Sequence, residues 1–63
     1  MKLSTFHHKK IKITTTDEEV FSGYVINYLP ADENEPERES IVVECQNGIF
    51  EFYEDELKHV EIL

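Results

Sequence analysis

The chain has 63 residues, of which 14 are acidic and 6 are lysine or arginine, giving a formal net charge of −8. This length allows a single domain over residues 1–63, and the only cysteine, Cys45, excludes a disulfide bond within the chain. Because nucleic-acid phosphates attract lysine and arginine, the negative charge opposes non-specific binding to nucleic acid, and it also opposes binding to anionic membranes.

We expect no signal for export or for membrane insertion in this chain. Residues 1–8 lack the apolar segment of a signal peptide. No apolar run approaches the roughly 20 residues of a transmembrane helix. A lone thiol is consistent with a reducing compartment. The sequence therefore predicts a cytoplasmic protein without a membrane partner.

The first segments in chain order are a short lead-in and a half-buried strand. Within residues 1–8, Leu3 and Phe6 are spaced for one helical turn that could cover an end of the fold. Residues 9–16 then alternate between apolar and polar side chains, which is typical of a strand with one wet face.

A second strand is predicted over residues 19–29, after an acidic turn, and it is apolar on both faces. With strict alternation, one face carries Val20, Tyr24, Ile26 and Tyr28. The other face carries Phe21, Gly23, Val25 and Leu29. A long strand of this kind with an internal glycine predicts a bend, so that one strand serves both halves of a small barrel.

The second half of the chain predicts a long loop and three more strands. Residues 30–39 are polar, acidic and marked by proline, as in a loop. The strands are predicted over residues 40–45, 49–53 and 58–62. Asn47-Gly48 predicts a type I′ hairpin turn with positive φ at both residues. A single turn links the last two strands.

These elements predict an all-β fold, a five-stranded and strongly bent antiparallel barrel of SH3-like type. Seven inward-facing side chains are expected to be the most buried: Ile13, Val25, Val43, Phe50, Phe52, Leu57 and Val60.

Two segments resemble the Sm-like family of small β-barrels. Residues 11–25, with a strand, an acidic turn and an apolar residue shortly before a glycine, resemble the first Sm motif. Residues 53–63 resemble the segment that joins the last two strands in that family. The resemblance implies a barrel whose last two strands are open edges, which pair between subunits to form a homo-oligomeric ring.

The resemblance also implies RNA binding as an alternative function. Asn34 could then fill the position of an asparagine that follows the second strand in that family. The family's second RNA-binding motif lies between the last two strands. At that position this chain has Tyr53-Glu54-Asp55, whose two carboxylates repel phosphate. The candidate RNA contacts are Lys9, Lys10, Lys12 and Asn34.

Two groups of candidate metal ligands lack the spacing of known sites. One group, in the acidic loop, comprises Asp32, Asn34 and Glu39, without the glycine that an EF-hand requires. The other comprises His7, His8 and His59. Cys45 has inward parity, which is typical of an inert buried thiol. We therefore expect no metal, no cofactor and no small-molecule substrate, and a protein that is not an enzyme.

Several apolar side chains exceed what such a small domain can bury. Four of them are candidates for an exposed interaction surface: Tyr24, Tyr28, Ile49 and Tyr53. The negative charge favours a protein over nucleic acid as the partner. The sequence therefore predicts a non-catalytic interaction module that acts through self-association or through binding to another protein.

Overall fold

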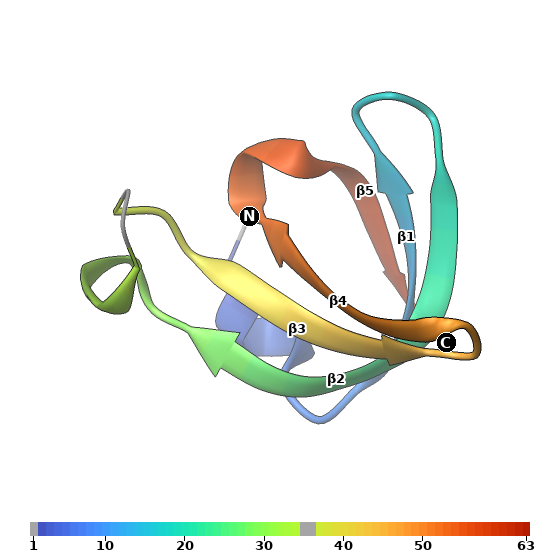
Figure 1. Cartoon of the computed structure of the whole chain (residues 1–63), viewed down its shortest axis with the longest axis horizontal. Helices are drawn as coiled ribbons and strands as arrows, with labels where there is room; N and C mark the ends of the chain where they lie inside the picture. The colour runs from blue at the N-terminus through green and yellow to red at the C-terminus, as the bar shows by residue number, and fades with distance from the viewer. Residues whose placement is uncertain (1, 35–36) are drawn as a thin grey trace.

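The computed structural model describes residues 2–34 and 37–63, which form a five-stranded antiparallel sheet (Figure 1). The strands are β1 (Lys10–Thr15), β2 (Val20–Leu29), β3 (Ser40–Cys45), β4 (Gly48–Tyr53) and β5 (Leu57–Ile62). Short 3₁₀ turns lie at η1 (Leu3–Phe6), η2 (Ala31–Glu33) and η3 (Glu54–Glu56). No helix of the described residues could cross a membrane. The all-β prediction is confirmed, while Met1 of the predicted lead-in and residues 35–36 of the predicted loop lie outside the described residues.

The sheet is strongly curled, but its two edges do not pair. The strand order is β4-β3-β2-β1-β5, so β4 and β5 are the edge strands. The start of β2 nevertheless faces β4, because the Phe21 ring packs against Phe50 and Phe52 with centroid distances of 5.5 and 5.0 Å. The curl brings the two halves of the sheet around one core (Figure 1). Within the described residues the sheet is open rather than a closed barrel.

A β-bulge divides β2 into two parts. The pairing with β3 shifts between Val25 and Asn27, which leaves Ile26 as the extra residue. Before the bulge the inward positions follow the predicted alternation, with Phe21 half-buried and Val25 fully buried. A bulge bends its strand and reverses the alternation beyond it. The predicted bend in this strand is therefore present, at Ile26.

Gly23 allows the backbones of β2 and β3 to approach closely. A Cβ atom at this position would lie 2.2 Å from the carbonyl oxygen of Glu44, a contact that no side chain can make. The glycine is thus required by the close contact between two backbones, three residues before the bulge.

The core consists of eight buried side chains drawn from η1 and all five strands: Leu3, Ile11, Ile13, Val25, Ile41, Val43, Phe52 and Leu57. Five of the seven predicted core residues are confirmed. Phe50 and Val60 are only half-buried and pack against the outside of this core. Leu3 is fully buried, so the lead-in contributes to the core.

The hairpin between β3 and β4 differs from the predicted type I′ turn. Cys45 pairs with Gly48, so the two turn residues are Gln46 and Asn47. Among the described non-glycine residues, only His8 and Glu18 have positive φ, so Asn47 does not. Gly48 begins β4 with a φ of 144°. The prediction of positive φ at both Asn47 and Gly48 is therefore wrong, because the pairing places the turn one residue earlier.

Candidate interaction surfaces and cavities

The outer face of the sheet brings together two of the four predicted surface residues. Tyr24 of β2 and Ile49 of β4 both pair with Glu44 of β3, so the three side chains form one row across three strands. Tyr24 is 42% exposed and Ile49 is 59% exposed. The row therefore offers apolar surface on an inner strand and at an edge, with a carboxylate between them.

Tyr28 lies on the core side of the sheet instead. Beyond the bulge it pairs with the fully buried Ile41, and it packs against the core. Its hydroxyl donates a hydrogen bond to Glu39 Oε1 at 3.0 Å. Burial, together with this carboxylate, raises the pKa of Tyr28. The bulge thus separates Tyr28 from Tyr24, although strict alternation had placed both on one face.

Tyr53 is the last residue of β4, and the side chain of Arg38 lies over its ring. The guanidinium carbon of Arg38 lies 4.4 Å from the centre of the Tyr53 ring, a cation–π contact. Arg38 also forms an ion pair with Asp55, with 2.5 Å between Nη1 and Oδ2. Arg38 therefore covers one face of the Tyr53 ring and compensates one of the two carboxylates that distinguish this segment from the Sm-like pattern.

The candidate RNA-contact lysines Lys9, Lys10 and Lys12 are all exposed. In the strand pairing Lys10 lies opposite Tyr24, and Lys12 lies opposite Glu61 of β5. The outer face of β1 is therefore basic, but an acidic side chain lies beside it on the neighbouring strand.

Asn34 is used within its own loop. Its side-chain nitrogen donates hydrogen bonds to the carbonyl oxygen of Arg38 at 2.7 Å and to Ser40 Oγ at 3.0 Å. Ser40 in turn donates to Glu51 Oε2 at 2.7 Å. These bonds fix the end of the loop to β3 and occupy both hydrogens of the Asn34 amide, while the candidate lysines lie on and beside β1.

The histidines do not converge on one point. The rings of His7 and His8 stack at 3.9 Å, and His8 Nδ1 lies 3.4 Å from the Tyr24 hydroxyl. His59 lies on β5, opposite Thr14. Across residues 2–34 and 37–63, no three histidine, cysteine or acidic side chains are grouped to hold a metal ion.

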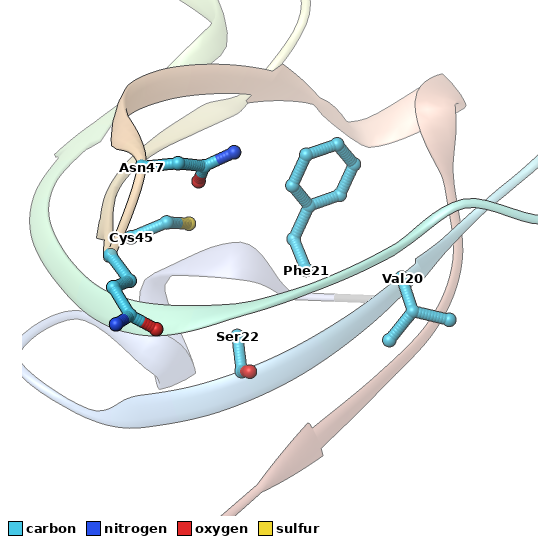
Figure 2. A pocket seen from close by; sticks show the side chains of 6 residues that line it. Val20, Phe21, Ser22, Cys45 and Asn47 are labelled. Atoms are coloured by element: carbon cyan, nitrogen blue, oxygen red, sulfur yellow. The ribbon is translucent and has the colours of Figure 1, made fainter.

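A first cavity, of about 310 Å³, opens between the start of β2 and the β3–β4 hairpin (Figure 2). Its lining residues are Val20, Phe21, Ser22, Cys45, Gln46 and Asn47. Figure 2 shows the side chains of Cys45 and Asn47 projecting from the hairpin toward Phe21. Burial raises the pKa of the Cys45 thiol, which keeps it protonated at neutral pH and therefore weakly nucleophilic.

A second cavity, of about 220 Å³, lies between the β1–β2 turn, β4 and η3. Its lining residues are Thr15, Thr16, Asp17, Glu19, Phe21, Phe52 and Glu56. Thr15 holds the turn together, since its hydroxyl donates to the Asp17 carboxylate and accepts the Glu19 backbone N–H at 3.1 Å. The hydrogen bond from Thr15 lowers the pKa of Asp17, which therefore stays ionised.

Phe21 lines both cavities. The sequence placed it on the β2 face shared with Gly23, Val25 and Leu29 and among the apolar residues considered for an exposed patch, but it predicted no cavity there. The local pattern holds a signal that could have found it. Phe21 is the second residue of β2 and is separated from the acidic turn by Val20 alone, so it lies near the end of its strand.

No family model matches this chain, and neither the curated proteins nor the solved structures compared with it give a match.

Proposed function

We propose that the chain is a non-catalytic interaction module, built as a small SH3-like or Sm-like barrel, that self-associates through its edge strands. The support for this barrel type is the strand order, the bulge in β2 and the single 3₁₀ turn, η3, between the last two strands. The sequence resemblance of residues 11–25 and 53–63 to the Sm-like pattern points the same way.

The observation that carries this proposal is the composition of β4 as an edge strand. β4 has six residues, pairs with β3 on one side, and contains Glu51 as its only charged residue. Natural edge strands usually carry lysines, prolines or bulges that block pairing with another chain. β4 has none of these, and its Ile49 is 59% exposed. Such an edge favours the addition of a strand from a second polypeptide.

The net charge of −8 opposes the association of identical subunits. This repulsion acts over a Debye length of about 8 Å at physiological ionic strength and weakens as salt is added. Backbone hydrogen bonds and apolar contacts at an edge depend much less on salt. The association should therefore become tighter as the salt concentration rises.

Sedimentation velocity at low and high salt tests the proposal. We expect an oligomer whose association strengthens with salt. A monomer under both conditions would contradict self-association and would leave a different protein as the partner of β4.

Two matched variants separate edge pairing from packing of the outer face. Ile49→Lys and Tyr24→Lys each replace an exposed apolar side chain of the same row by a lysine, so they change the net charge equally. Ile49 lies on an edge strand, whereas Tyr24 lies on β2, between β1 and β3. We expect Ile49→Lys to dissociate the oligomer and Tyr24→Lys to leave it assembled. The opposite pattern would place the interface on the outer face.

RNA binding is a second candidate, favoured by the exposure of Lys9, Lys10 and Lys12 beside Tyr24. A cationic strand beside an aromatic ring is suited to phosphates and bases. Because phosphate contacts weaken with salt, this function predicts the opposite salt response from self-association. The absorbance ratio at 260 and 280 nm, before and after a high-salt wash, tests it: bound nucleic acid that salt removes would support RNA binding.

A further inference from the structure

We call the cavity between the β1–β2 turn, β4 and η3 the acidic cavity. Its residues come from three segments that the curl of the sheet brings together: the end of β1 with the following turn, Phe21 with Phe52, and Glu56 of η3. It therefore exists only in the folded chain and has a defined shape and chemistry.

The rim of the acidic cavity is anionic. Asp17, Glu19 and Glu56 contribute three carboxylates, and no lysine or arginine is among the lining residues. Glu56 uses one oxygen to accept the Tyr53 backbone N–H at 2.9 Å, which fixes the position of its carboxylate. Lys58 forms an ion pair with Glu18, the turn residue between Asp17 and Glu19, with 2.5 Å between Nζ and Oε1.

Two aromatic rings supply the apolar wall. Phe21 and Phe52 lie 5.0 Å apart between centroids, with their planes inclined by 60°. Phe52 is almost fully buried, and Phe21 is half-buried, so Phe21 offers ring surface toward the opening. Aromatic rings attract cations, and the attraction grows when the cation is partly removed from water.

The size of the acidic cavity limits what it can hold. Sites for drug-sized ligands are typically about 300–1,000 Å³. At about 220 Å³, the acidic cavity suits one long side chain rather than a nucleotide or a larger molecule. A group with an apolar stem and a positive end would contact both the rings and the carboxylates.

We propose that the acidic cavity binds a lysine or arginine side chain of a partner polypeptide. The alkyl stem lies against Phe21 and Phe52, and the charged end lies among Asp17, Glu19 and Glu56. The site adjoins β4 through Phe52, whereas its three carboxylates belong to the β1–β2 turn and η3, so binding of the side chain does not require self-association.

An NMR titration with small probes tests the site. The probes are lysine with both ends blocked, its uncharged analogue blocked norleucine, and butylammonium. We expect blocked lysine to shift the backbone amide signals of residues 15–21, 52 and 56, and norleucine to leave them unchanged. Equal shifts with norleucine, shifts spread over the whole acidic surface, or no shifts at all would overturn the proposal.

Variants assign the binding to the cavity. Glu19→Gln should weaken the binding of blocked lysine about two- to fivefold, which is the range for the loss of one exposed ion pair. Glu44→Gln is the matched control, because it removes the same charge from the outer face of β3 and should have no effect. Phe21→Leu keeps an apolar side chain but removes the ring, and it should also weaken binding. Equal affinity of wild type and Glu19→Gln would overturn the proposal.

Two further comparisons identify the kind of ligand. A blocked Ala-Lys-Ala tripeptide should bind more tightly than butylammonium if the partner is a polypeptide, and equal affinity would overturn that assignment. Binding of the probes should weaken as salt rises, whereas self-association should strengthen. Failure of one proposal is therefore distinguishable from failure of the other.

Discussion

One end of the curled sheet is closed, and the side around Phe21 is open. At the closed end, Leu3 of η1 has no exposed surface, and Glu39 Oε1 accepts both the Leu3 backbone N–H at 3.3 Å and the Tyr28 hydroxyl. At the open side, Phe21 is half-buried and lines both cavities.

The difference indicates which part of this 63-residue chain is left uncovered and available to bind a partner. η1 is the only described segment outside the sheet that adds a residue to the core, and it covers one end. No equivalent segment covers the Phe21 side. The closed end should therefore carry most of the stability, and the open side should carry recognition.

The largest expected effect is at the closed end. Leu3→Ala should reduce the free energy of unfolding by about 2–5 kcal/mol, because it creates a cavity at a fully buried site. Ile62→Ala removes the same number of carbon atoms from a side chain that is 49% exposed, and it should cost less than about 1 kcal/mol. Urea unfolding measures both, and equal costs would show that η1 does not close the core.

The next effect concerns the close approach of the β2 and β3 backbones at Gly23. Gly23→Ala should cost about 1–3 kcal/mol, because the added methyl group would collide with the Glu44 carbonyl oxygen. The exposed neighbour Ser22→Ala provides the control. Thermal unfolding measures the effect, and an unchanged melting temperature for Gly23→Ala would mean that the two backbones are further apart.

The hairpin on the open side tests the corrected turn. Gly48→Val should destabilise by about 1 kcal/mol or more, since Gly48 has a φ of 144°. Asn47→Ala should change stability by less than about 0.5 kcal/mol, because Asn47 does not have positive φ. A loss of about 1 kcal/mol or more for Asn47→Ala would instead indicate positive φ at Asn47, as in a type I′ turn.

The smallest effect concerns the rim of the open side and depends on pH. The Thr15 hydrogen bond lowers the pKa of Asp17 below its ordinary value of 3.8. A carboxyl group with a lowered pKa in the folded state stabilises the fold above its unfolded pKa, and this contribution is lost as the pH falls through the folded pKa. Wild type should therefore lose more stability below pH 3.8 than Asp17→Asn does. Parallel pH profiles from denaturant unfolding would contradict this.

The fold class and the approximate bounds of all five strands were predictable from alternation and turn residues. Two features were not predictable, because they depend on how strands pair. The bulge at Ile26 moved Tyr28 to the core side, and the pairing of Cys45 with Gly48 moved the hairpin turn. A single inserted residue moves every side chain beyond it to the opposite face of the sheet. The residue pattern alone does not reveal where such a bulge lies.

The candidate surfaces were predictable only in part. Tyr24 and Ile49 share a row because both residues pair with Glu44 of β3. The acidic cavity required tertiary contact between segments far apart in sequence, Asp17 and Glu56 among them. Alternation predicts which face a residue occupies, but not which distant residues the curl brings beside it.

Amide hydrogen exchange in β4 tests the central claim most directly. In an antiparallel edge strand, only alternate amides bind the neighbouring strand, so the remaining amides of Gly48–Tyr53 face outward. The account predicts that these outward amides exchange more slowly as protein concentration rises at high salt, while the exposed amides of the β1–β2 turn do not change. Rapid exchange of the outward β4 amides at every concentration would contradict self-association through this edge.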